Sequence, residues 1–566
     1  MSWKRMDAIN LTQHSFALKA KHNPEHRFRD LYHLICRQEW IEQALNSVLA
    51  NQGARTAGVD GITRQDFQEP TYWVNFVTEL QLELKSRAYQ PTPARRKWIP
   101  KPKGGHRPLG ICIIRDRTVQ MLLKMLLEPI AESDFLECSY GFRPGRRTMD
   151  CIGICRRYIQ RRSKFYWIIE GDIRGCFNHI QHTKLVSLIQ QRVADRQIIQ
   201  LIERFLKAGI LEGEWYHPTQ EGVPQGSVVS PLMANWYLHQ FDWWWWQKYG
   251  ALSTREKTKR RQRGLTNSRL VRFADDWLLL TNGSRSQAEE LRQEAGQFLW
   301  DQLGLELNLE KTRITQANDG FEFVGFHLQW LTPSNRKPWL RAKPTTDNIN
   351  RFKAKIRQMT HGQQLADPYS KIIALNRVLQ GWMQYYRHAN AKDIAHKLDW
   401  WVYRRVTHWL KCHHKWGIRR TLAQYEHQQS GRRKHLAICN EYGRLVFLYR
   451  MSDLPITQYR TRNYPNPYIQ LEPDVIQAQD EPVNPLGTDT WCGGSRHAEW
   501  HELRRQIIQR DGYVCRQCGN TNQLEVHHIL ARHQGGTDDL LNLITLCENC
   551  HIKSDSYRAM FSQQSK

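Results

Sequence analysis

Features that would restrict where a protein works are missing from this sequence of 566 residues. It has no run of about 18 or more apolar residues, so no membrane-spanning helix is expected. No apolar signal-peptide core follows the N-terminal Met-Ser-Trp-Lys-Arg. The thirteen cysteines are odd in number and mostly scattered singly, which does not fit the disulfide framework of a secreted protein. We therefore expect a protein that works in a reducing cytoplasm without a membrane partner.

Acidic residues are scarce relative to basic ones. The sequence has 55 Asp and Glu against 82 Lys and Arg, a net charge of +27. Of that excess, +18 comes from residues 336–450, which hold 24 Lys and Arg and only 6 Asp and Glu. A merely solvated surface normally mixes the two signs, whereas the phosphates of a nucleic acid supply the missing negative charge. The composition therefore predicts a nucleic-acid partner.

The most informative motif is the pair of adjacent aspartates in Val271-Arg-Phe-Ala-Asp-Asp-Trp-Leu-Leu-Leu280. Side chains alternate along a strand, so two neighbouring Asp fit best at the tight turn of a β-hairpin, and alone such a pair is more often just a polar turn. A second apolar strand, from Ile168, also ends at an Asp. Three carboxylates at strand ends can hold two Mg²⁺ about 3.5–4 Å apart, as in-line nucleotidyl transfer requires. The sequence therefore predicts a polymerase palm with the catalytic metal ligands Asp172, Asp275 and Asp276.

Three further segments predict contacts with a nucleotide. Ile99–Gly110 predicts two strands joined by a glycine turn, whose Lys and Arg can neutralise a triphosphate, although a basic surface hairpin fits equally well. An aromatic residue, Phe177, stands five positions after the first Asp, where it would lie under the sugar and exclude a 2′-hydroxyl. Gly222–Pro231 is a Pro/Gly-rich turn that leads into a helix. The candidate nucleotide-binding residues are Lys101, Arg107, Phe177 and Gln225.

The C-terminal residues contain a metal-binding pattern. Two Cys-x-x-Cys pairs, separated by 28 residues, suit one tetrahedral, structural Zn²⁺. By itself this pattern also fits a zinc ribbon that only binds a partner. The predicted zinc ligands are Cys515, Cys518, Cys547 and Cys550. Polar residues with possible catalytic roles lie between the pairs or directly after them, namely His527, His528, Asn542 and His551.

Composition and periodicity divide the chain into several segments, and together these predict a multidomain α/β protein. Residues 1–91 have helix-spaced apolar positions, and residues 92–335 alternate short strands with helices. Residues 336–450 predict a basic, helical, RNA-binding domain, in which aromatics at helical spacing are more often core than base-stacking surfaces. Residues 451–490 are rich in proline and then in acidic residues, as a linker is, and residues 491–566 form a separate module.

The motifs together resemble those of the reverse transcriptase-maturases encoded within group II introns, over nearly the whole chain. The resemblance rests on Gly171–Phe177, Pro224–Gly226, Phe273–Asp276, Tyr140–Pro144, Asn308–Thr312, Phe323–Phe326 and Leu379–Tyr386. Two residues depart from the family pattern: Asn178 stands where Asp is common, and Phe273 where Tyr is common. Neither departure removes a metal ligand.

The resemblance implies a right-hand polymerase followed by an HNH endonuclease. It implies an N-terminal extension and fingers (1–91), fingers and palm (92–335), a thumb or maturase domain X (336–450), a DNA-binding segment or linker (451–490) and a ββα-metal HNH nuclease (491–566). In the nuclease, His527 and His551 would bind a divalent cation (Mg²⁺ or another). His528 would be the base that activates water, and Asn542 would support the site.

The implied function is that of a group II intron-encoded protein. Such a protein copies intron RNA into DNA from dNTPs, binds the intron RNA to assist splicing, and nicks target DNA to prime reverse transcription during retrohoming. It would be found in the bacterial cytoplasm, associated with the nucleoid when it acts on DNA. The alternatives are a maturase that only assists splicing, and a host-defence or retron-like reverse transcriptase.

Overall fold

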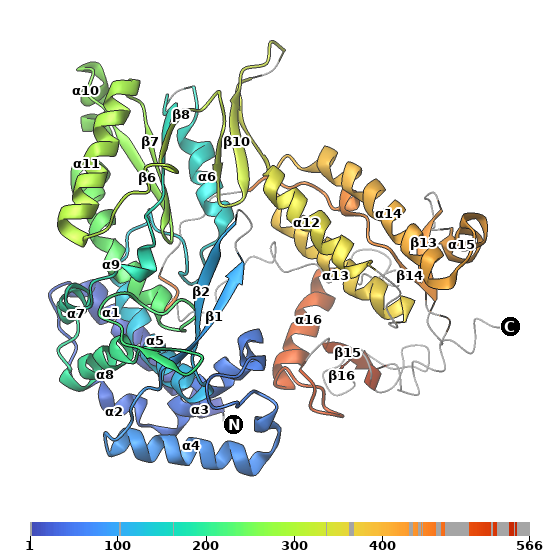
Figure 1. Cartoon of the computed structure of the whole chain (residues 1–566), viewed down its shortest axis with the longest axis horizontal. Helices are drawn as coiled ribbons and strands as arrows, with labels where there is room; N and C mark the ends of the chain where they lie inside the picture. Colours follow the sequence, from blue (N-terminus) through green and yellow to red (C-terminus); the bar gives the residue numbers. More distant parts are fainter. Residues whose placement is uncertain are drawn as a thin grey trace. The chain divides into compact units, whose positions relative to one another are not determined.

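The computed structural model describes the chain in two compact units, Met1–Asp474 and Val475–Lys566 (Figure 1). The described residues are 3–100, 104–161, 163–335, 337–361, 367–428, 434–439, 443, 445–459, 466–469, 497–521, 524–528, 543–547 and 550–551. Within these ranges no helix is both long and apolar enough to cross a membrane.

The first unit begins with helices, as the periodicity predicts. These are α1 (Trp3–His22), α2 (Tyr32–Ile35), α3 (Gln38–Ala50) and α4 (Pro70–Lys85). They are followed, after one β-hairpin, by the long helix α5 (Ile114–Asp134), which packs against α1 and α3. The leucines of α5 are fully buried in the first hydrophobic core. This core therefore joins the N-terminal helices to the rest of the unit.

A four-stranded sheet with the order β2-β1-β4-β5 contains the predicted basic hairpin. Strands β1 (Ala94–Pro100) and β2 (His106–Ile111) pair antiparallel, and β4 (Ile210–Glu212) runs parallel to β1. Strand β5 (Trp215–His217) closes the edge. Helices α7 (His182–Gln190) and α8 (Arg196–Lys207) precede β4, and Ala94 at the start of β1 is buried. The prediction of two paired strands within residues 99–110 is confirmed, while residues 101–103 between them lie outside the described residues.

The central sheet, with the order β6-β7-β3-β8, separates two hydrophobic cores. Its strands are β3 (Trp167–Gly171), β6 (Ser268–Phe273), β7 (Asp276–Thr281) and β8 (Arg313–Gln316). Alternate residues sort to opposite faces. One face, including Ile169, packs in the first core with α9 (Ser230–Trp245) and α11 (Arg285–Leu303). The other face, including Ile168, packs in a second core with α6 (Thr148–Tyr158). The sheet is therefore buried on both sides and holds its strand ends rigidly.

Four consecutive tryptophans, Trp243–Trp246, lie where α9 gives way to a π-helical turn, Trp246–Gly250. Trp245 is almost fully buried, and Trp244 stacks between Phe241 and Phe298. These rings pack α9 against α11, which lies beside the central sheet. A short polar helix, α10 (Thr254–Gln262), follows and leads into β6.

The basic helices, α12–α15, form the far side of the second core. They are α12 (Thr346–Met359), α13 (Pro368–Tyr385), α14 (Lys392–His414) and α15 (Ile418–Tyr425). A three-stranded sheet precedes them, made of β9 (Phe321–Phe323), β10 (Phe326–Leu331) and β11 (Trp339–Pro344). A second small sheet follows, made of β12 (Glu426–His427), β13 (His435–Cys439) and β14 (Leu445–Phe447). The helical prediction is confirmed for α12–α15, and the second sheet was not foreseen.

The aromatic residues of these helices divide between core and surface. Met383 and Tyr386 are fully or almost fully buried, and Trp382 packs against the same core. Trp400 is 62% exposed. The core interpretation is therefore confirmed around residue 382 and wrong for Trp400.

Residues that follow the basic helices contact first α14 and then the N-terminal part of the unit. The Asp399 carboxylate accepts backbone N–H bonds from Met451 and Ser452, at 2.8 and 2.9 Å. Further along, the Tyr468 hydroxyl donates to Glu128 of α5 at 2.6 Å. Much of the predicted linker from 451 to 490, including its acidic part, lies outside the described residues.

The second unit is small and built around two strands. Helix α16 (His497–Arg510) packs against an antiparallel pair, β15 (Leu524–His528) and β16 (Leu543–Cys547). The Asp511 carboxylate accepts the backbone N–H of Thr545 at 2.7 Å, which ties the end of the helix to the second strand.

Candidate active sites

The adjacent aspartates lie at the hairpin that the sequence predicts. Strand β6 ends at Phe273 and β7 begins at Asp276, so Asp275 lies in the turn. Gly171, the last residue of β3, pairs with Trp277, and continuing this register by one residue sets Asp172 opposite Asp276. Opposed residues of an antiparallel pair have Cβ atoms about 4.5–5.5 Å apart. The fold therefore brings together carboxylates that are about a hundred residues apart in the chain.

The three carboxylates repel one another electrostatically. Burial and the neighbouring Asp275 and Asp172 raise the pKa of Asp276 to about 6. Burial and Asp172 also raise the pKa of Asp275, while Arg107 and Arg272 oppose the rise. The repulsion between clustered like charges of this kind is relieved by a bound cation, and oxygen ligands suit Mg²⁺. The donor set therefore fits the predicted divalent ions.

A buried arginine, Arg272, contacts the backbone of the aspartate turn and stabilises it. Arg272 is inaccessible to solvent and forms a bidentate ion pair with Asp242 of α9, at 2.7 and 2.5 Å. It also donates to Asn235 at 3.0 Å and to the backbone carbonyl of Ala274 at 2.9 Å. Ala274 has a φ of +58°, an unusual conformation for a residue with a side chain. Arg272 therefore holds the turn in a conformation that its own sequence would not favour.

Two residues near Asp172 were not among the predicted site residues. Lys311 donates to the Asp172 carboxylate at 2.9 Å, and Asn308 donates to the same oxygen at 3.0 Å. The backbone N–H of Asn308 also donates to the Asp172 carbonyl at 2.9 Å. Both residues belong to Asn308–Thr312, one of the motifs on which the resemblance to the intron-encoded family rests. That motif is the sequence signal that could have identified them as site residues.

The predicted nucleotide-binding residues are partly brought together. Phe177 lies in a short 3₁₀ turn, Cys176–Asn178, and its carbonyl accepts the N–H of Val223 at 2.7 Å. The backbone carbonyl of Gln225 accepts the N–H of Gly110, at the base of the β1–β2 hairpin, at 2.7 Å. Both side chains are half-buried, so each keeps an accessible edge. Arg107 lies on β2 and is close enough to lower the pKa of Asp275 and Asp276, whereas Lys101 lies outside the described residues.

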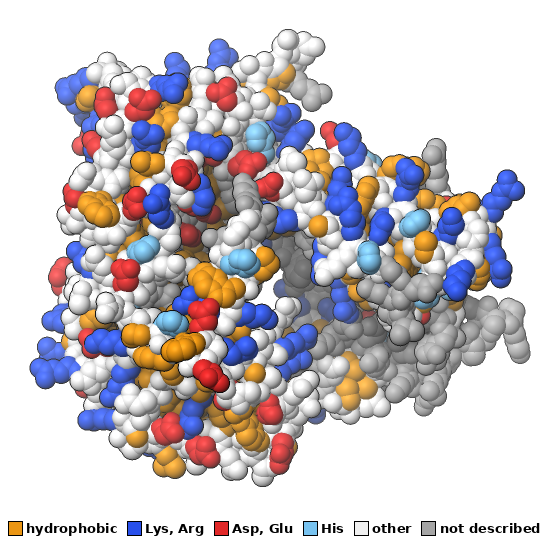
Figure 2. Space-filling model, viewed as in Figure 1, with side chains coloured by type: hydrophobic (Ala, Val, Ile, Leu, Met, Phe, Trp, Pro, Cys, Tyr) orange, Lys and Arg blue, Asp and Glu red, His pale blue; other side chains and the backbone are white. Residues whose placement is uncertain are grey.

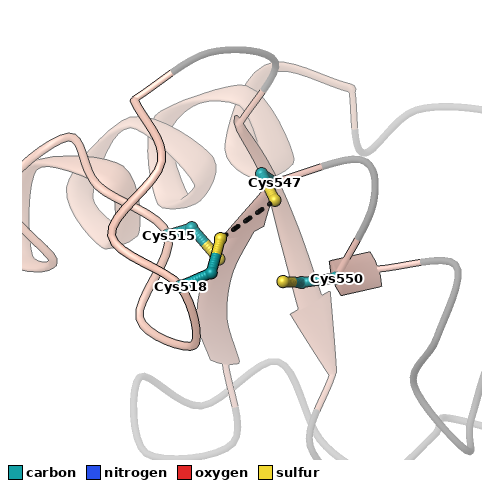
Figure 3. Close-up of side chains that lie close together, drawn as sticks. All are labelled: Cys515, Cys518, Cys547 and Cys550. Atoms are coloured by element: carbon teal, nitrogen blue, oxygen red, sulfur yellow. Dashed lines mark hydrogen bonds between the residues drawn. The ribbon is translucent and has the colours of Figure 1, made fainter.

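The four predicted zinc ligands converge in the second unit (Figure 3). Their sulfur atoms all lie within 4.8 Å of one another, and those of Cys518 and Cys547 are 3.5 Å apart. Burial opposes ionisation of the Cys515 thiol, but backbone N–H groups of Cys547 and Cys518 lower its pKa below the usual value. Because zinc binds thiolates in a tetrahedron, this cluster fits a structural Zn²⁺.

Two of the predicted nuclease residues lie side by side. His527 is buried on β15, and its ring centroid is 4.9 Å from that of His551. Glu525 pairs with Nδ1 of His551. Glu525 was not among the predicted site residues, although it stands two positions before His527 and so shares its strand face. The backbone of His528 pairs with Leu543, while its side chain and all of Asn542 lie outside the described part of the chain.

The chain matches three protein families. Residues 99–328 match "Reverse transcriptase (RNA-dependent DNA polymerase)", residues 349–426 match "Group II intron, maturase-specific domain", and residues 515–556 match "HNH endonuclease". The first match contains the three aspartates, the second contains most of the basic helices, and the third begins at the first zinc-ligand candidate. Reverse transcriptase and HNH domains usually use divalent metal ions.

Individual relatives agree with these matches. The chain is 36% identical to Protein YkfC of Escherichia coli K12, covering 56% of this chain and 88% of that protein. It is 30% identical to the group II intron-encoded protein LtrA of Lactococcus lactis, covering 61% of this chain and 65% of LtrA. An uncharacterized 91 kDa protein in the cob intron of Schizosaccharomyces pombe is 27% identical, covering 95% of this chain and 71% of that protein.

The family matches define a nucleic-acid polymerase joined to a nuclease. More specifically, the chain belongs to the reverse transcriptase-maturases encoded by group II introns. It is a multifunctional enzyme with an RNA-dependent DNA polymerase domain and an HNH endonuclease domain. These domains imply that it binds intron RNA and uses DNA as a substrate.

Proposed function

We propose that the protein copies its intron RNA into DNA at the central sheet, which acts as the palm of a right-hand polymerase. The observation that carries this proposal is the pairing of β3 with β7, because it sets Asp172 beside the Asp275–Asp276 turn. Two Mg²⁺ bound there would activate the primer 3′-hydroxyl and stabilise the triphosphate leaving group. The β1–β2 hairpin acts as part of the fingers and α12–α15 as the thumb.

The surrounding residues position the substrates. Arg107 reaches toward the metal-ligating carboxylates from β2, where a guanidinium can neutralise the phosphates of an incoming nucleotide. Phe177 lies beside the turn that contains Gln225, and its ring closes the space next to the sugar. Lys311 and Asn308 fix the Asp172 carboxylate before the substrates bind.

The second unit cuts the DNA that supplies the primer. Cys515, Cys518, Cys547 and Cys550 would hold a structural Zn²⁺ that ties the loop after α16 to the end of β16. His527 and His551 would hold the catalytic divalent cation, and Glu525 orients the His551 ring through its Nδ1 atom. His528 removes a proton from the attacking water, and Asn542 supports the site.

We expect Phe177→Ala to admit ribonucleotides. Removing the ring opens the space that a 2′-hydroxyl needs, so the ratio of rNTP to dNTP incorporation should rise by about tenfold or more, since one lost steric contact is worth about 1–3 kcal/mol. The measurement is single-nucleotide extension of a primer on an RNA template. Phe177→Tyr keeps the ring and should retain the preference for dNTPs. An unchanged ratio in Phe177→Ala would show that the ring serves only to pack the core.

We also expect intron RNA to bind mainly through the basic residues of 336–450. A chain that ends at Asp474, the limit of the first compact unit, should still bind the RNA. Its affinity should fall steeply as salt rises, because cations on the protein release counterions from the phosphates. Filter binding over a series of salt concentrations measures this. Salt-independent binding, or loss of binding on removal of residues 475–566, would contradict the assignment.

The whole proposal is tested by target-primed reverse transcription. Protein and intron RNA are combined with a DNA target and dNTPs, and both the nick and the extended product are measured. We expect a nicked strand whose 3′ end is extended with a copy of the RNA, and neither product without divalent cations.

A further inference from the structure

One face of α14 carries a row of exposed basic residues and a single exposed tryptophan. Apart from His396, which adjoins Lys397, neighbours in this row are three or four residues apart, so they share one side of the helix. They are His396, Lys397, Trp400, Arg404, His408 and Lys411. On the face in view in Figure 2, Lys, Arg and His side chains gather over the basic helices, and few acidic side chains lie among them.

Trp400 is held in a fixed orientation although it is exposed. Its ring stacks on Tyr403, with centroids 5.9 Å apart and planes 8° apart. Tyr403 in turn stacks on His435 of β13, at 5.9 Å and 19°. The Tyr403 hydroxyl donates to Glu426 at 2.6 Å, which fixes that ring. One face of the tryptophan is therefore supported by protein, while 62% of the side chain remains exposed.

The surroundings of Trp400 favour a negatively charged ligand. Lys397 and Arg404 stand one turn before and after it, and Lys353 and Arg357 of α12 lie over the neighbouring Trp401, at 5.7 and 5.5 Å. The nearby Asp399 is occupied by the backbone N–H bonds of residues 451 and 452. A rigid aromatic ring between cations combines a surface for a base with partners for the adjoining phosphates.

We propose that the exposed face of α14 binds a single-stranded segment of RNA, with one unpaired base stacked on Trp400. This inference rests on the proposed RNA-binding function and assigns a specific site within it. From Lys397 to Lys411 the helix rises about 21 Å, enough for several nucleotides. Single-stranded RNA is favoured over a duplex, because paired bases already stack on their neighbours and cannot present a free face to the ring.

The experiment compares the full chain with Trp400→Ala. The probe is a single-stranded RNA of about 12 nucleotides that contains 2-aminopurine, and an unlabelled primer–template duplex saturates the polymerase site. We expect Trp400→Ala to weaken binding about tenfold, which corresponds to about 1.4 kcal/mol. The quenching of 2-aminopurine fluorescence on binding should be lost as well. Trp400→Phe retains a ring and should keep most of both effects.

Trp300 provides a matched control. It is 60% exposed and lies on α11, where Glu289, Glu290, Glu294 and Asp301 outnumber the two arginines. Trp300→Ala should leave binding and quenching unchanged. Circular dichroism should match wild type for both alanine variants, because neither ring is needed to fill a core, and primer extension on the supplied duplex should match wild type for Trp300→Ala.

The possible outcomes distinguish failure of this stacking site from failure of the RNA-binding function on which it rests. If wild type binds intron RNA in a salt-dependent way but Trp400→Ala leaves the 2-aminopurine probe's affinity unchanged, the stacking site is wrong and the RNA-binding function stands. If wild type fails to bind intron RNA, the function itself fails. An equal loss for single-stranded RNA and for an RNA duplex of the same length would overturn the assignment of an unpaired base. Unchanged RNA binding together with loss of a protein partner would identify a protein-docking surface instead.

Discussion

Asp275→Asn should reduce RNA-templated DNA synthesis to less than about a tenth of the wild-type rate, because lost metal coordination commonly costs several kcal/mol of transition-state stabilisation. The substitution keeps the size and shape of the side chain but removes the charge, and one of the two oxygen ligands, that a divalent ion needs. Binding of intron RNA and assistance to splicing should remain, since they depend on the basic surface of residues 336–450. Primer extension with Mg²⁺, measured beside RNA binding, checks both halves of the expectation.

The variant should also fold normally. Asp275 and Asp276 both have raised pKa values, owing to burial and to the nearby carboxylates, so removing one negative charge relieves repulsion in the metal-free protein. Thermal unfolding without divalent ions should therefore show a midpoint at least as high as that of wild type. Asp301→Asn, on the exposed face of α11, is the control and should polymerise normally. Wild-type synthesis by Asp275→Asn would remove the three aspartates from the catalytic site.

Cys518→Ser and His528→Ala should separate two roles of metal in the second unit. The four sulfur atoms lie within 4.8 Å of one another and join the loop after α16 to the end of β16. Losing one thiolate should release zinc and unfold the residues from about 491 onward, because a structural zinc contributes directly to folding free energy. His528→Ala should retain zinc and fold but stop DNA cleavage, since the base that activates water is lost.

Three measurements on the same preparations distinguish these variants: zinc content, nicking of a DNA target by the protein–RNA complex, and extension of a supplied primer. Extension should be unaffected in both, because the first compact unit contains the whole central sheet. Cys439→Ser, at an exposed cysteine of β13, is the control for a thiol outside the cluster. Normal nicking by His528→Ala would make the second unit a zinc-stabilised DNA-binding domain rather than a nuclease.

Several elements could be predicted because their signals are local. The aspartate turn, the strand that ends at Asp172 and the basic hairpin each follow from alternation and turn chemistry within about ten residues. The Cys-x-x-Cys spacing likewise predicts a cluster, because two residues between cysteines bring both sulfur atoms to one ion. The helices α12–α15 follow from apolar periodicity.

Other features depend on residues that are distant in the chain, and no local pattern reveals them. The ion pair between Arg272 and Asp242 links a strand to a helix and supports the catalytic turn. Lys311 meets Asp172 only because the chain returns past β3 to form β8. The exposure of Trp400 could not be predicted either, because an aromatic residue at helical spacing is more often core, and only its packing partners reveal an exception.

The sequence by itself determined the chemistry of this protein: which residues can bind metal ions, where the chain turns, and which region carries positive charge. Only the tertiary structure decided which of these residues meet. Short-range patterns fix backbone conformation and side-chain direction, since those depend on neighbouring residues. The meeting of Asp172 with Asp276 and of Tyr403 with His435 depends on strand register and helix packing, which the burial of two extended cores imposes on the first unit. The meeting of Glu525 with His551 depends in the same way on the packing of the second unit.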